Sequence, residues 1–83
     1  MNVNFAHMTL DEAPLRSPVV VKHVGGERSF RRRLMELGLV PGTAVRVEKV
    51  APLGDPLELS TRGCRISIRK REAKAVDVEP ARA

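Results

Sequence analysis

The sequence predicts a mainly β (all-β) fold: a small barrel or sandwich of about five short strands, with one short helix after the first strand. Two observations predict it. Short segments of alternating apolar and polar residues are separated by turn residues roughly every 8–12 positions, which is typical of small barrels and sandwiches. The chain has two Phe and no Trp or Tyr, so its core must be built from Val, Leu and Ile.

Length, composition and charge set the class of protein. The chain has 83 residues, of which 42% are hydrophobic, and a net charge of +5. This length indicates one domain, and the apolar share argues against disorder. We expect residues 1–8 to be a flexible leader, residues 9–80 the domain and residues 81–83 a tail. The positive charge permits attraction to nucleic acid, an anionic membrane surface or an acidic protein, and it selects none of them.

The sequence also predicts a compartment. A single Cys excludes an internal disulfide framework and suits a reducing cytosol. No apolar run approaches the roughly 20 residues needed to cross a bilayer, and the first residues lack the basic and apolar regions of a secretory signal. We therefore expect a cytoplasmic protein that is peripheral to the membrane at most.

The first half of the chain predicts a short helix, then a strand, then a second helix. Thr9 and Glu12 match a capping box, but Pro14 limits that helix to about one turn. The β-branched segment 19–24 predicts a strand, which Gly25-Gly26 ends.

The second helix is predicted from Ser29, as N-cap, to about Leu37. Gly38 then fits the left-handed position that closes a helix, and Leu39 fits the apolar position that follows it. The apolar residues expected to pack in the core are Phe30, Leu34, Leu37 and Leu39.

Alternating residues predict four further strands, at 43–50, 57–62, 64–68 and 74–79, with a polar connection at 70–73. The alternation slips at Lys49-Val50, which indicates a bulge or the end of the strand. Arg62-Gly63 predicts a tight hairpin turn. The residues expected to face inward are Val45, Val47, Leu57, Leu59, Cys64, Ile66, Ile68, Val76 and Val78. The glycines expected to form structural turns are Gly38, Gly42 and Gly63.

The connection Ala51–Pro56, APLGDP, is longer than a hairpin needs. Pro52 suits the second position of a type I turn with Gly54 at the fourth, and the Asp55 carboxylate can accept a local backbone N–H. Pro56 is tolerable at the first position of a strand. These features predict a stiff loop, which loses little entropy when a partner docks on it.

Leu53 lies near the tip of this loop, and two interpretations are open. Either the leucine folds back over the end of the barrel while the prolines set the register, or it belongs to a preformed docking surface.

Three segments together resemble the FeoA family, the small cytosolic component of bacterial ferrous iron transport: LMELGLVPGTAVRV, APLGDPLEL and RGCRISIRKREAKAVDVEP. The resemblance spans residues 19–80. It implies an SH3-like barrel that is not an enzyme and that serves as an accessory factor of FeoB, a membrane transporter with a cytosolic GTP-binding domain. The same domain occurs fused to iron-dependent repressors.

The resemblance places the signature positions of the family at the end of the helix and in the six-residue loop. We expect these segments to form one apolar patch that docks on a partner. Its residues would be Leu37, Leu39, Val40, Pro41, Pro52, Leu53, Gly54, Asp55 and Pro56.

Metal binding has weak support. The candidate ligands are His7, His23 and Cys64, and no pair of them has the spacing of a metal motif. Cys64 is expected to be a small core residue. A metal bridging two chains through the leader is a better interpretation of His7 than an iron site. We expect no cofactor and no dedicated iron site.

Two hypotheses of function remain. The first is a non-enzymatic module that contacts the cytosolic domain of a FeoB-type transporter. The alternative is a small basic barrel that binds nucleic acid, or a regulatory domain related to iron-dependent repressors. We expect no nucleic acid because the chain lacks the aromatic side chains on which single-strand binders stack bases. Weak self-association through a strand edge or an apolar patch is a further expectation.

Overall fold

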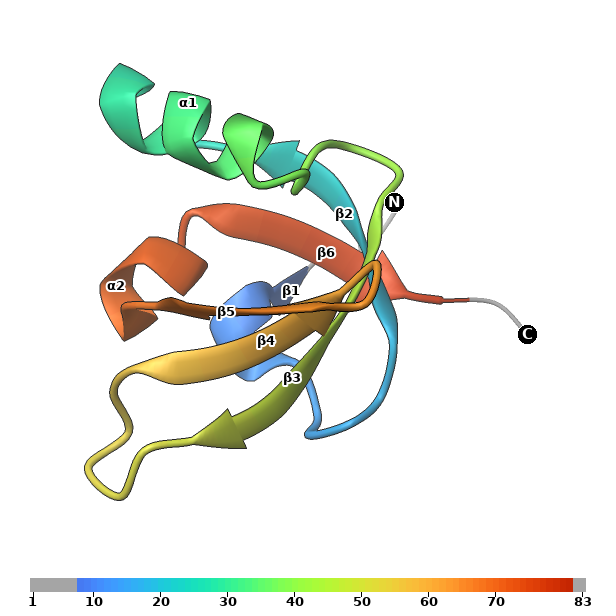
Figure 1. The fold of residues 1–83 in the computed structure, drawn as a ribbon, viewed down its shortest axis with the longest axis vertical. Helices are drawn as coiled ribbons and strands as arrows, with labels where there is room; N and C mark the ends of the chain where they lie inside the picture. The colour runs from blue at the N-terminus through green and yellow to red at the C-terminus, as the bar shows by residue number, and fades with distance from the viewer. Residues whose placement is uncertain (1–7, 82–83) are drawn as a thin grey trace, which may run out of the picture.

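The structure, a computed structural model, describes residues 8–81. The predicted mainly β fold is confirmed (Figure 1). Within the described residues, six antiparallel strands form one sheet in the order β1-β6-β2-β3-β4-β5. The elements are β1 (Met8–Thr9), the 3-10 helix η1 (Leu10–Glu12), β2 (Val19–Val24), α1 (Arg28–Glu36), β3 (Ala44–Val50), β4 (Leu57–Thr61), β5 (Cys64–Ile68), α2 (Lys70–Ala73) and β6 (Val76–Pro80).

Two irregularities bend the sheet around its core. The register of β2 against β6 shifts between Val21 and His23, and that of β3 against β4 shifts between Val47 and Lys49. A bulge adds one residue to a strand and increases its local twist, so these shifts help the sheet to curl. The second shift lies just before the slip that the sequence predicts at Lys49-Val50.

The core is aliphatic, as the composition requires. Alternate residues of the strands point into it, and η1, α1 and α2 add further side chains. The buried apolar residues are Leu10, Ala13, Val19, Val21, Leu34, Leu39, Val45, Val47, Leu57, Leu59, Ile68, Ala73, Val76 and Val78. Ile66 is only partly buried, against the edge of this cluster.

Helix α1 begins two residues earlier than predicted. Glu27 is its N-cap, in extended conformation, and Ser29 lies inside the helix, so the prediction of a Ser29 cap is wrong. The cause is the turn that precedes it. Gly26 has a positive φ of 89° and lies against the ring of Phe30, where an added Cβ would come within 3.0 Å of a ring carbon. This close approach turns the chain into the helix directly after the glycines.

The end of α1 follows the predicted pattern. Gly38 has φ +93°, and its N–H donates to the carbonyl of Met35, while the N–H of Leu39 donates to the carbonyl of Leu34. These are the two hydrogen bonds of a Schellman motif, which satisfy carbonyls that the helix leaves free. Leu34 and Leu39 are both buried in the core, but Leu37 is 43% exposed, so its predicted core position is wrong. Leu37 is the C-cap residue of α1, directly before the turn at Gly38.

Two short elements were not predicted. Met8, which the sequence analysis assigned to the leader, pairs with Val78 in β1, and residues 70–73, predicted as a polar connection, form α2. The carboxylate of Glu72 accepts the N–H of Arg69, as that of Glu12 accepts the N–H of Thr9 in the predicted capping box at η1. The same three-residue spacing in Arg69–Glu72 is the signal that could have revealed α2.

The inward position predicted for Cys64 is wrong, because the residue is exposed. Cys64 follows a two-residue turn in which Arg62 and Gly63 both have positive φ, as the tight-turn prediction requires. Burial along this face of β5 increases from Cys64 through Ile66 to Ile68. The hairpin end therefore extends beyond the core.

The Schellman turn supplies a test of how α1 is held. We expect Gly38→Ala to lower the free energy of unfolding by about 1 kcal/mol, because a side chain disfavours the left-handed conformation. The nearest atom to an added Cβ is 3.8 Å away, in the Arg62 side chain, so the cost is conformational and not a clash. Gly38→Asn is the matched control and should cost less, since Asn tolerates this conformation. Urea unfolding measures both; equal losses would contradict the explanation.

The position of Cys64 supplies a second test. The single thiol of the chain should react fully with Ellman's reagent in the native protein, at a rate that urea changes little. Reaction that begins only in denaturant would show that the thiol is buried.

Candidate partner-docking surface

The connection between β3 and β4, Ala51–Pro56, is held by its own backbone. The N–H of Gly54 donates to the carbonyl of Ala51 at 2.7 Å, and the N–H of Ala51 donates to the carbonyl of Pro56 at 3.1 Å. The first bond closes the turn that the sequence predicts, with Pro52 at its second position and Gly54 at its fourth.

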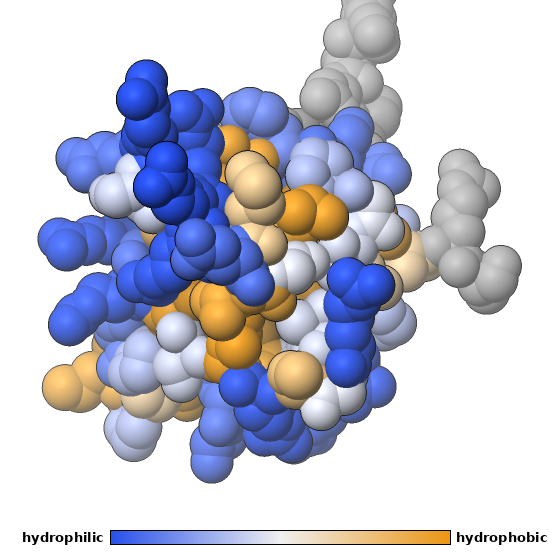
Figure 2. Space-filling model, turned by 45° about the horizontal axis from the view of Figure 1, so that its top comes forward, coloured by the Kyte–Doolittle hydropathy of each residue, from blue (hydrophilic) through white to orange (hydrophobic). Residues whose placement is uncertain are grey.

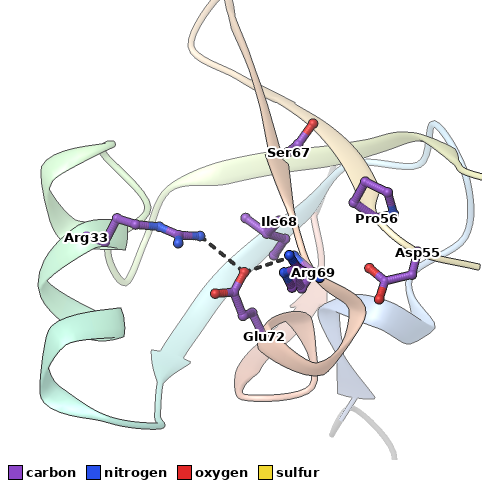
Figure 3. A pocket seen from close by; sticks show the side chains of 7 residues that line it. All are labelled: Arg33, Asp55, Pro56, Ser67, Ile68, Arg69 and Glu72. Atoms are coloured by element: carbon purple, nitrogen blue, oxygen red, sulfur yellow. Dashed lines mark hydrogen bonds and ion pairs between the residues drawn. The ribbon is translucent and has the colours of Figure 1, made fainter.

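Asp55 ties this loop to α2. Its carboxylate accepts the backbone N–H of Lys70 at 3.0 Å, at the start of α2. The local Asx turn predicted for Asp55 is therefore not the contact that the structure shows. Figure 3 shows Asp55 and Pro56 at one side of a pocket of about 360 Å³ that also contains Arg33 and Glu72. Three hydrogen bonds thus fix the loop, two internal and one to α2.

Glu72 connects the two helices across the same pocket. Its carboxylate accepts a hydrogen bond from the Arg33 guanidinium at 3.1 Å and from the Arg69 N–H at 2.9 Å (Figure 3). The ion pair with Glu72 compensates the charge of Arg33. Through these contacts Glu72 links α1 to α2, next to the β3–β4 loop.

Leu53 lies at the tip of the fixed loop and is 97% exposed. Of the two interpretations of this residue, folding back over the barrel end is excluded. A large apolar side chain on a rigid, solvent-exposed turn is the kind of group that a partner protein can bury at little entropic cost.

The end of α1 does not join this loop. Leu39 is buried, Val40 is half-buried, and Leu37 and Pro41 are exposed. Figure 1 shows the α1 end on the opposite side of the molecule from the β3–β4 loop. The residues predicted to form one docking patch therefore belong to two separate surfaces, and Leu39 belongs to the core.

The second surface is a groove of about 620 Å³ beside α1. Its residues Val40 and Pro41 were predicted to belong to a docking patch. The residues that α1 contributes to the groove, which are cationic and apolar, were not predicted. It is lined by His23, Val24, Arg28, Arg31, Arg32, Met35, Leu39, Val40 and Pro41. The signal for that wall was the spacing of residues 28, 31, 32 and 35, which is i, i+3, i+4, i+7 on one helical face.

The metal-ligand candidates are not brought together. His7 lies outside the described residues. His23 is exposed and paired with Asp77 at 3.5 Å, and Cys64 lies at the start of β5. Within residues 8–81, no group of three His, Cys, Asp or Glu side chains is arranged to hold a metal ion. In the same range, no helix is long and apolar enough to cross a membrane.

The basic residues of the outer sheet are interleaved with acids. Arg46 pairs with Glu48 at 3.0 Å, and Arg65 pairs with Glu58 at 3.4 Å. This face of β3, β4 and β5 is therefore close to neutral over short distances, which disfavours it as a track for phosphates.

Glu48 is the carboxylate most affected by this arrangement. Its pKa lies below the ordinary value of 4.5, first because the Ser60 hydroxyl donates a hydrogen bond to it, and also because Arg46 and Arg65 attract its charge; partial desolvation opposes them.

A lowered native pKa predicts a pH-dependent contribution to stability. The Glu48 interactions stabilise the fold above pH 4.5 and are lost as the pH falls through the lower native pKa. The Glu48→Gln variant should therefore be less stable than the wild type near neutral pH, and this difference should shrink in acid. The exposed Glu36→Gln variant is the control. A difference that stays constant across the acid range in urea unfolding would contradict the assignment.

Comparison with known proteins supplies the family. The model of the FeoA domain matches residues 8–80. A curated relative, a Fe(2+) transport protein A/Fe(2+) transporter FeoB fusion protein of Porphyromonas gingivalis, is 33% identical over 72 residues. The match covers 87% of this chain and only 8% of that relative.

Two solved structures are similar over most of the chain. FeoA of Chlorobium tepidum has a TM-score of 0.86 and 39% identity, covering 90% of this chain and 71% of that one. The zinc complex of Stenotrophomonas maltophilia FeoA, described as a prokaryotic SH3 domain protein, has a TM-score of 0.76 and 39% identity, covering 87% and 89%. The SH3-like fold implied by the resemblance is confirmed, and the chain belongs to the FeoA domain family, which is associated with ferrous iron transport.

Proposed function

We propose that this protein is a non-enzymatic, cytoplasmic accessory protein of bacterial ferrous iron transport that contacts the cytosolic domain of a FeoB-type transporter. The observation that carries the proposal is Leu53, 97% exposed on a loop that three hydrogen bonds fix. The loop presents one large apolar group in a single conformation, as a preorganised binding element does.

The fused relative supports the choice of partner. In the Porphyromonas gingivalis protein a FeoA segment and FeoB belong to one chain. Fusion holds two modules at high effective concentration, which favours contact between them even when their intrinsic affinity is low. We infer that a separate FeoA chain makes the same contact by diffusion. The Stenotrophomonas maltophilia relative is described in similar terms, as a candidate activating factor of ferrous iron transport.

The test is a charge placed at the loop tip. Leu53→Asp should weaken binding to the purified cytosolic domain of FeoB from the same organism by about thirtyfold, since losing a buried Leu costs about 2 kcal/mol. It should also lower ferrous iron uptake. The fold should be unaffected, because the side chain contacts little of the protein.

Leu15→Asp is the matched control, because Leu15 is another exposed leucine, at 53%, in the loop before β2. It should leave binding unchanged. Calorimetric titration measures the affinities, and circular dichroism checks the fold. Equal affinities of wild type and Leu53→Asp would refute the loop tip as the contact.

A further inference from the structure

The groove beside α1 combines apolar walls with positive charge that takes part in no ion pair within residues 8–81. Val24 from the end of β2 and Val40 and Pro41 from the α1–β3 connection form one side, and Met35 of α1, 61% exposed, forms part of the other. Figure 2 shows the face of the molecule that α1 occupies, where apolar surface lies between clustered hydrophilic side chains.

Three arginines of α1 line this groove: Arg28, Arg31 and Arg32. Within residues 8–81, none of the three takes part in an ion pair, whereas the adjacent Arg33 pairs with Glu72. The residues that line the groove, all of them described, include no Asp or Glu. His23, on the opposite wall, pairs with Asp77, which is outside that lining.

Like charges one helical turn apart on the same face of a helix destabilise it slightly. The arginines at 28, 31 and 32 therefore repel one another. Glu27 and Glu36 lie at i, i+4 from Arg31 and Arg32 and weaken this repulsion, but within residues 8–81 neither forms an ion pair with these arginines. A partner that supplies carboxylates would relieve this repulsion, and its apolar side chain would cover Met35 and Val40.

We propose that this groove binds an acidic protein segment in which carboxylates flank a large apolar side chain. The apolar anchor lies between Met35 on α1 and Val40 and Pro41 on the facing connection. The carboxylates pair with Arg28, Arg31 and Arg32. Met35 suits such a site because its flexible thioether adapts to different apolar groups. The site is separate from Leu53, so the inference does not depend on the proposed transporter contact.

Other anionic partners fit less well. The residues that line the groove, all of them described, include no Phe, Tyr or Trp on which a nucleic-acid base could stack. A lipid surface favours apolar groups that protrude beyond the charges, whereas Leu39 of this groove is buried and Val40 is half-buried. Charge and concave shape together therefore favour a peptide.

The probe is the synthetic peptide acetyl-Glu-Asp-Leu-Phe-Asp-Glu-amide carrying a fluorescent label, titrated with the full chain in fluorescence anisotropy. We expect binding with a Kd below about 1 mM that weakens as salt is added. A peptide with Ser in place of Leu-Phe, and one with Lys in place of the acids, should not bind measurably. The variant Arg28→Gln/Arg31→Gln/Arg32→Gln should bind roughly tenfold more weakly, and Met35→Ser should also lose affinity.

A matched control removes the same charge elsewhere. Lys49→Gln/Lys70→Gln/Arg71→Gln changes three exposed cations outside the groove lining and should bind the peptide like the wild type. Leu53→Asp should also bind the peptide normally, which separates this test from that of the transporter contact. The Gln substitutions keep a good helix former in α1, and circular dichroism checks the fold.

Three results would overturn the proposal. They are no peptide binding at millimolar concentration, equal loss in both triple variants, and arginine-dependent binding to phosphatidylglycerol vesicles without binding to the peptide. The last would assign the groove to a lipid surface.

Discussion

A small apolar contact, made by Leu34 and Leu39, attaches α1 to the sheet. The groove beside α1 depends on this contact. Leu34 is the one described residue of α1 that is fully buried, and the Schellman turn at Gly38 brings Leu39 into the same core. Because so little of the helix faces inward, its other sides remain on the surface. The turn also sets where Val40 and Pro41 lie, so it forms the second wall of the groove.

A second constraint joins the six-residue loop to the rest of the molecule. Asp55 accepts the first N–H of α2, from Lys70, while Glu72, two residues later, accepts a hydrogen bond from Arg33 of α1. Loop, α2 and α1 are therefore linked through polar contacts outside the aliphatic core. A domain of this size has little apolar surface to bury, so such contacts stabilise what the core cannot reach. The loop can be long and still rigid for this reason, and Leu53 is held in solvent.

Local patterns in the sequence predicted most of the fold. Alternation of Val and Leu located β3 and β4, and Gly38 located the end of α1, because these signals act within a few residues. Burial near element ends was harder to predict. Leu37 and Cys64 occupy apolar positions of their patterns but lie beyond the limits of the core, which only the assembled sheet defines. The residues predicted to form one docking patch divide between the groove beside α1 and the β3–β4 loop, which Figure 1 shows on opposite sides of the molecule. No local pattern specifies which ends of a barrel lie close together.

The measurement that tests the central claim most directly is a titration of ¹⁵N-labelled protein with the unlabelled cytosolic domain of FeoB, followed through the backbone amide resonances. If the rigid loop is the contact with the transporter, the resonances of Leu53 and Gly54 should change most. Changes confined to the ion-paired outer face of β3, β4 and β5, or no change at any amide, would contradict the account.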